Sequence, residues 1–169
     1  RYAMDGTKLM DDNIPLILDP EVPALVMPAG ADARVKGARC AKYEIQKNNP
    51  YSNQDNDFVV FRLGDAYLMR GEAYLRLGKT TEALADINVI RTRAGVPAYT
   101  AATLTLDELL AERGREMAWE GHRRQDLIRF GQYNKEWRFK PASQAFRTLF
   151  PIPNDQLNLN KNLHQNPGY

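Results

Sequence analysis

The sequence predicts a mainly α-helical fold made of helical hairpins, with an irregular loop and short-strand segment before them and an extended strap after them. Apolar and small residues recur at helical spacing between residues 58 and 131. Residues 1–57 are rich in Pro, Gly, Asp and Asn and hold only short apolar stretches. Residues 132–169 combine prolines with asparagines, a composition that excludes a long helix and favours a strap. We expect all three segments to belong to one domain.

The N-terminal segment has room for two or three short strands. The apolar stretches that favour them are Ile14–Leu18, Ala24–Met27 and Arg39–Ile45, and a polar turn follows before the helices. The single cysteine, Cys40, can form no disulfide within the chain, and we expect it to be a buried small hydrophobe. The chain opens on Arg1 without an initiator Met or a leader, so we expect a fragment, a processed product or a trimmed form of a larger protein.

Residues 58–94 match a tetratricopeptide-type helical hairpin. Gly71 and Ala83 are small enough to let two helices approach closely, and aromatic and aliphatic side chains fill the groove between them, namely Tyr67, Tyr74, Leu84 and Ile87. Gly78 is expected to end the first helix in a left-handed conformation, and Thr80 to cap the second.

A second, degenerate hairpin follows. Thr105 and Glu108 have the spacing of a capping box, so a helix should begin there and run to about Glu120. Gly121 then breaks the chain, and residues 122–130 form a shorter helix. Such hairpins cannot cover their own apolar faces, so other parts of the protein must cover them.

The charges of this second hairpin are predicted to be structural. Glu112, Glu116 and Glu120 recur every four residues and would repel one another on one helix face unless arginines come close. We expect a partly buried ion-pair network, with Arg113, Arg123 and Arg129 as the cations, that fixes how two helices cross. We expect Trp119 in the core, where its truncation to Ala would cost about 3 to 5 kcal/mol. The predicted network comprises Glu112, Arg113, Glu116, Trp119, Glu120, Arg123 and Asp126.

Composition and motifs exclude several classes of function. The net charge is only +2, with acids and bases interleaved, so nucleic-acid binding has no support. The longest apolar runs are far shorter than a membrane helix requires. His122 and His164 lack metal-ligand spacing, and phosphate-binding, dinucleotide and nucleophile-elbow motifs are missing. We therefore predict no catalytic residue, no metal and no cofactor.

Two alternatives involve sugars directly. Glu116, Glu120 and Asp126 near His122 suggest a glycosidase, because such enzymes use a pair of carboxylates. Glu116 and Glu120, however, lie one turn apart on one helix and leave no room for a sugar between them. Sugar binding needs exposed aromatic faces beside polar groups. Tyr51, in an Asn- and Asp-rich loop, and Trp137, beside Tyr133, Asn134 and Arg138, are the candidates.

The stretch ERGREMAWEGHRRQDLIRFG, residues 112–131, resembles the C-terminal signature of the SusD/RagB family, the surface glycan-binding lipoproteins of Bacteroidetes. Its pattern is E-R-x-x-E-hydrophobic-x-aromatic-E-G-H-R-x-x-D-L-x-R-aromatic-G, and every fixed place is filled. The sequence resembles this family also over residues 61–74, 149–153 and 165–169. The resemblance covers roughly the last two thirds of the chain.

This resemblance implies a protein that binds nutrients and does not catalyse. The whole protein would lie on the surface of the outer membrane, held by an N-terminal lipid outside this chain. It would pass oligosaccharides or other nutrients to a SusC-like TonB-dependent transporter. In the family the glycan platform is built largely upstream of the signature, so no binding residue is transferred. A tetratricopeptide adaptor for a protein partner is the alternative from another class, and more regular repeats upstream would favour it.

Overall fold

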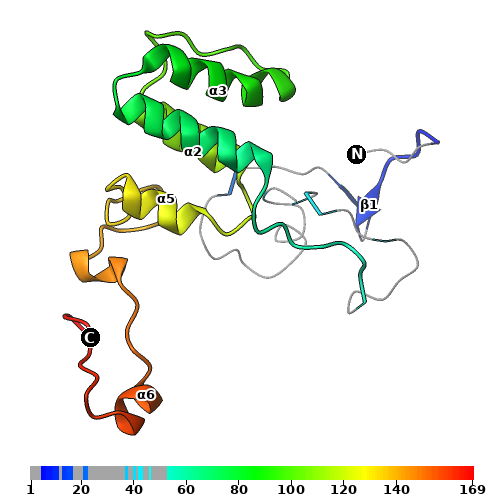
Figure 1. The fold of residues 1–169 in the computed structure, drawn as a ribbon. Coiled ribbons are helices and arrows are strands. Elements are labelled where there is room, and N and C mark those ends of the chain that lie inside the picture. The colour runs from blue at the N-terminus through cyan, green and yellow to red at the C-terminus, as the bar shows by residue number, and fades with distance from the viewer. Residues whose placement is uncertain are drawn as a thin grey trace. The chain divides into compact units, whose positions relative to one another are not determined.

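The computed structural model describes residues 5–11, 13–16, 21–22, 37, 40, 42–43, 46 and 53–169 (Figure 1). The chain divides into two compact units, one of residues 1–56 with 138–140 and one of residues 57–137 with 141–169. The helices α2 to α6 belong to the second unit. The predicted mainly helical fold is confirmed.

The first unit contains a two-stranded antiparallel hairpin. Strand β1 (Met10–Asp11) pairs with β2 (Ile14–Pro15), with Met10 opposite Pro15. Asn13 turns the chain with a φ of 65°, a left-handed value that asparagine adopts more readily than most residues. Of the stretch expected to form a strand from Ile14, the structure describes the first three residues: Ile14 and Pro15 pair with β1, and the N–H of Leu16 donates to the carbonyl of Leu9 at 2.9 Å.

The other two predicted strands lie wholly or largely outside the described residues. Cys40 is described, and its side chain is exposed, so the prediction that it is buried is wrong. The backbone at this residue belongs to neither a strand nor a helix. An argument from alternating side chains therefore does not apply there.

The helices α2 (Leu63–Arg76) and α3 (Thr80–Arg93) form the predicted hairpin, side by side in Figure 1. Their close approach depends on Gly71, because a Cβ built there would lie 2.5 Å from Cδ1 of Ile87. Ala83 and Ile87 are completely buried. A small residue on one helix thus receives a branched side chain from the other, as the sequence predicted.

A left-handed glycine ends each helix of this hairpin. Gly78 has a φ of +73°, its N–H donates to the carbonyl of Leu75, and the N–H of Lys79 donates to the carbonyl of Tyr74. These are the two hydrogen bonds of a Schellman motif, and Gly95 repeats the arrangement after α3. The cap predicted at Thr80 is wrong, since Lys79 is the N-cap residue and Thr80 already lies in the helix.

Helix α4 (Leu106–Glu116) packs against α2 and completes the core. The Thr105 hydroxyl accepts from the N–H of Glu108 at 3.1 Å, which confirms the predicted cap. The helix ends at Glu116, not near Glu120 as predicted, because the chain turns through Trp119 and Gly121, both with positive φ. The buried core comprises Leu68, Ala83, Ile87, Ile90, Leu104, Leu109 and Met117.

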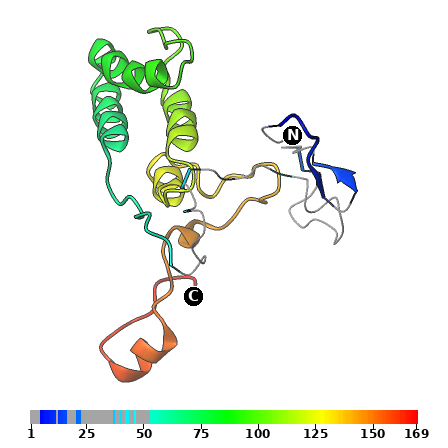
Figure 2. The same cartoon turned by 90° about the vertical axis from the view of Figure 1, so that its right-hand side faces the viewer.

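Helix α5 (Arg123–Arg129) packs against α4, and Figure 2 shows it in yellow close to the end of that helix. The C-terminal residues form the predicted strap, interrupted by a 3₁₀ turn η1 (Ala145–Thr148) and a short α6 (Asn154–Leu159). Among the described residues, no helix has the length and apolarity needed to cross a membrane.

Side chains close this strap upon itself. The Gln165 amide exchanges two hydrogen bonds with the backbone of Ile152, at 2.8 and 2.9 Å. The rings of Phe146 and Tyr169 meet edge to face at 4.9 Å. Arg124 of α5 donates to the carbonyl of Thr148 and so ties the strap to the helical part.

Candidate functional site

A buried arginine joins three helices at the centre of the second unit. Arg113 of α4 lies 3.0 Å from a carboxylate oxygen of Asp65 in α2 and 2.9 Å from one of Asp126 in α5. All three side chains are at most 3% exposed. The N–H directions are not aligned with these oxygens, so the contacts are ion pairs without hydrogen-bond geometry. Removing one member would leave a buried charge unpaired.

Arg62, the residue before α2, neutralises two glutamates of the signature. Its guanidinium donates to both carboxylate oxygens of Glu120, at 2.6 and 2.8 Å, and to Glu116 at 2.6 Å. These hydrogen bonds, the strongest of them to Glu120, raise the pKa of Arg62. The side chains of Glu116 and Glu120 are 8% and 2% exposed. Both carboxylates are therefore held beneath the surface by a cation 54 to 58 residues away in the sequence.

The third glutamate of the series is neutralised from two directions. Glu112 pairs with Arg91 of α3 at 2.7 Å and with Arg115 one turn along its own helix at 2.6 Å. Arg93 adds a second cation to Glu116 at 2.6 Å. The sequence analysis predicted that arginines neutralise these glutamates, and it proposed arginines of the signature itself. Three of the observed arginines precede the signature in the sequence, namely Arg62, Arg91 and Arg93.

Arg123 differs from the prediction. Its Nη1 donates to the carbonyl of Leu110 at 2.7 Å, and no carboxylate pairs with it among the described residues. The guanidinium lies against Gly114, where a Cβ would come within 2.8 Å of Nη1. Arg123 therefore joins α5 to α4 through a backbone carbonyl and not through an ion pair.

Sequence reasoning missed a further cluster on the inner face of the hairpin. Glu72 of α2 is 4% exposed and accepts two hydrogen bonds from Arg129, each at 2.9 Å, and one from Arg76. Burial raises the pKa of Glu72, but the hydrogen bonds from the two arginines outweigh this effect, so its pKa lies below the ordinary value. Asp86 of α3 similarly pairs with Arg70. The available signal was that both acids fall at core-facing positions of otherwise apolar helix stripes.

The acids of the signature are engaged in ion pairs with arginines. A hydrolytic pair needs two carboxylates on opposite sides of a substrate. Glu116 and Glu120 instead share one guanidinium, and both are buried. Across the part of the chain that the structure describes, no group of three or more His, Cys, Asp or Glu residues could hold a metal ion.

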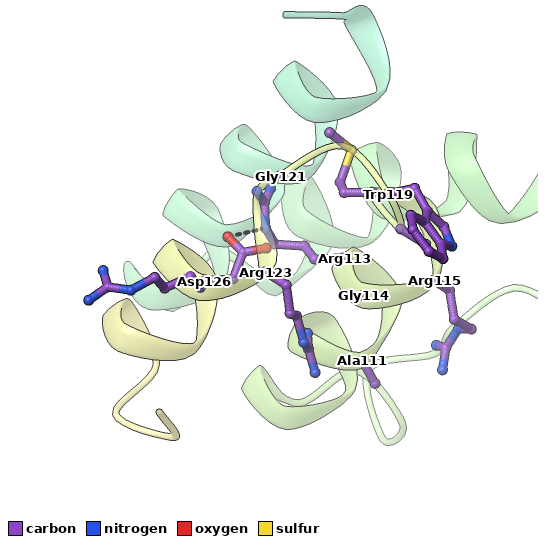
Figure 3. Close-up of a pocket in the computed structure, with 11 residues that line it drawn as sticks. Ala111, Arg113, Gly114, Arg115, Trp119, Gly121, Arg123 and Asp126 are labelled. Atoms are coloured by element: carbon purple, nitrogen blue, oxygen red, sulfur yellow. Dashed lines mark ion pairs between the residues drawn. The ribbon is translucent and has the colours of Figure 1, made fainter. Parts of the chain in front are cut away.

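Trp119 is not in the core, contrary to the prediction. Its side chain is 71% exposed and its φ is 65°, because α4 has already ended and the left-handed turn carries the indole away from the helix face that packs inward. Trp119 borders a hollow of about 680 Å³ between α4 and α5 (Figure 3). The large cost expected from truncating a buried aromatic therefore does not apply.

The two sugar-binding candidates have different positions. Tyr51 lies outside the described residues. Trp137 is 42% exposed and is the last residue of the range 57–137 of the second unit. One polar neighbour expected to serve a sugar, Asn134, has its side-chain oxygen occupied by the Ser143 hydroxyl at 3.0 Å.

Tetratricopeptide-like hairpins held together by buried ion pairs define a helical scaffold, and comparison with known proteins identifies its family. The model of the SusD family matches residues 27–144, and the chain belongs to this family. The starch-binding protein SusD of Bacteroides thetaiotaomicron is 39% identical over 124 residues, 68% of this chain and 22% of that protein. SusD-like protein P25 of Formosa agariphila is 33% identical over 67% of this chain and 24% of its own length.

Solved structures agree with this assignment. A SusD superfamily protein from Bacteroides vulgatus has a TM-score of 0.56 at 34% identity, over 66% of this chain and 28% of that one. A laminarin-binding SusD-like protein has a TM-score of 0.54 at 33% identity, over 65% and 23% of the two chains. The chain thus spans about a quarter of the length of the relatives it matches.

Proposed function

We propose that this chain is the C-terminal portion of a non-catalytic protein that binds nutrient glycans and delivers them to a SusC-like TonB-dependent transporter. The whole protein is a lipoprotein of the outer-membrane surface, anchored through an N-terminal lipid. The helical portion is the scaffold that supports the binding surface and keeps its helices in register.

Family membership and the relatives' ligands support glycan binding. One relative is named for starch binding and one solved neighbour for laminarin binding. Both ligands are glucose polymers without charge, so oligosaccharides of this type are the first probes to use. This chain matches less than a third of the length of each of these two proteins. Their ligands therefore indicate a class of ligand for this protein, but not the structure of that ligand.

The observation that carries the non-catalytic role is the shared guanidinium of Arg62. A general acid must present a proton to the glycosidic oxygen, and its partner must reach the opposite side of the sugar ring. Glu116 and Glu120 are both bonded to Arg62 and both shielded from solvent. They stabilise the crossing of the chain before α2 with the end of α4.

Binding and catalysis can be separated in one set of measurements. Calorimetric titration of the protein with maltoheptaose and with laminarihexaose should detect binding, and a reducing-end assay of the same mixtures should detect no hydrolysis. The Glu116→Gln variant should lose thermal stability. New reducing ends that disappear in this variant would instead establish a hydrolase.

Delivery to a transporter needs a separate test. In a Bacteroidetes host, the tagged protein should fractionate with the outer membrane, become accessible to external protease and co-purify with a TonB-dependent transporter. A soluble protein that binds peptide tails and no glycan would favour the tetratricopeptide adaptor.

A further inference from the structure

Two stretches of the strap, residues 149–153 and 165–169, lie side by side in the structure. The chain between them contains α6, and Figures 1 and 2 show the last residues, in red, returning toward η1. Residues 153–164 therefore form a loop whose two ends meet. A segment of this size with adjacent ends is an Ω-loop, a class of loop that is held together by its own side chains.

Side chains of the second stretch satisfy the backbone of the first. Pro151 has no N–H, so the first stretch lacks one donor that a regular strand ladder would use. The Gln165 amide accepts from the N–H of Ile152 at 2.8 Å and donates to its carbonyl at 2.9 Å. The side chain of Asn166 donates to the carbonyl of Phe150 at 2.7 Å. These amides take the place that a neighbouring strand has in a sheet.

Tyr169 adds a polar and an aromatic contact beyond these amides. Its hydroxyl donates to the carbonyl of Leu149 at 2.9 Å, and its ring meets the ring of Phe146 edge to face at 4.9 Å. Gly168 makes this approach possible, because its φ is +95° and a Cβ built there would overlap the Phe146 ring. A side chain at this position would strain the backbone and displace the ring.

The loop itself is not tied to the helical core by polar contacts. Among the residues that the structure describes, the hydrogen bonds from the helices to residues 145–169 come from Arg124, which donates to the carbonyls of Arg147 and Thr148 at 3.2 and 3.0 Å. The Arg124 guanidinium also lies 3.9 Å from the ring centroid of Phe150. These points of attachment all precede residue 153, so they hold the first stretch and not the loop.

We propose that residues 149–152 and 165–169 form a latch that keeps residues 153–164 closed, and that this loop opens as one unit when the latch is released. The opening leaves the helices folded, because the buried core cluster includes no residue of the strap. Local opening of this kind occurs in contiguous units that cost less free energy than global unfolding. The inference concerns a movement of the strap and does not depend on the proposed ligand.

Hydrogen exchange of the whole protein, followed by mass spectrometry with fragmentation to single residues, measures this opening. The N–H groups of Leu157, Asn160 and Leu163 donate to backbone carbonyls within the loop, so opening exposes them to exchange. Gln165→Ala removes both hydrogen bonds to Ile152 and should raise the exchange rates of these three amides together, by about tenfold. The exchange rates of α2 and α3 should not change.

Three further variants test the parts of the latch. Tyr169→Phe keeps the ring and removes the hydrogen bond of the hydroxyl, so it should raise the same rates to a smaller extent. Gly168→Ala conflicts with the Phe146 ring and should have a larger effect than the tyrosine variant. Gln156→Ala is the matched control, because it removes the same carboxamide from an exposed position of α6 and should leave the rates within about twofold of the parent.

Three results would overturn the proposal. If Gln165→Ala changes the loop amides no more than Gln156→Ala does, the amide contacts do not hold the loop closed. If exchange in α2 and α3 rises by the same factor, the loop opens only when the core unfolds. If the rate rises at Ile152 alone, the loop does not open as a unit. Melting temperatures equal to that of the parent are expected for all four variants.

Discussion

Gly71→Ala tests whether the close approach of α2 and α3 governs the stability of this fold. The added methyl group would lie 2.5 Å from Cδ1 and 3.0 Å from Cγ1 of Ile87, distances at which one of the helices or the Ile87 side chain must move. Ile87 is completely buried, so it has no open space to move into. The perturbation is thus a defined steric conflict at the centre of the hairpin.

The expected magnitude follows from two opposing effects. Overpacking a well-filled core costs about 1 to 3 kcal/mol. Replacing glycine by alanine within a helix returns up to about 1 kcal/mol. We therefore expect Gly71→Ala to lower the free energy of unfolding by up to about 2 kcal/mol. Ile87→Val alone should cost about 0.5 to 1.5 kcal/mol, because it removes one buried methyl group.

Combining the two substitutions gives the sharper measurement. Ile87→Val deletes Cδ1, the atom nearest to the new methyl group, so the double variant should be more stable than the sum of the single effects by at least about 0.5 kcal/mol. Urea unfolding followed by circular dichroism measures all four proteins, with the m-value checking that the unfolding transition is unchanged. Strict additivity of the two substitutions would refute the close-packing argument.

Three further perturbations have defined outcomes. Trp119→Ala should change the free energy of unfolding by no more than about 0.5 kcal/mol, as expected for an exposed residue, and a loss of several kcal/mol in urea would mean that the indole is buried. Arg113→Ala should cost about 3 to 5 kcal/mol, since it leaves two buried aspartates unpaired, and a melting temperature equal to that of the parent would contradict this. Glu72→Gln should destabilise at neutral pH: the folded pKa of Glu72 is lowered from 4.5, so its contribution is complete above that value and disappears as the pH falls through the folded pKa. Melting temperatures of Glu72→Gln and the parent should therefore converge in acid, and a constant difference would exclude this linkage.

The features of the helical part that the sequence predicted are local ones. The hairpin contact between Gly71 and Ile87, the left-handed turn at Gly78 and the cap at Thr105 each depend on residues within about one helical hairpin of each other. Helix propensity and residue spacing act over the same short range of sequence. Local features of this kind can therefore be recognised without knowledge of the rest of the fold. Boundaries were less well predicted, as the early end of α4 illustrates, because turn residues beyond a helix compete with its last turn.

The identity of the ion-pair partners depended on the tertiary structure. The sequence by itself established that glutamates spaced four residues apart on one helix need cations, since like charges at that spacing repel. It did not establish that Arg62 supplies them, because Arg62 and Glu120 are 58 residues apart and meet only through the way α2 and α4 cross. The exposure of Trp119 also depended on the tertiary structure. Helical periodicity predicts that this side chain points into the core, but α4 ends before Trp119, and a left-handed turn directs the side chain to the surface.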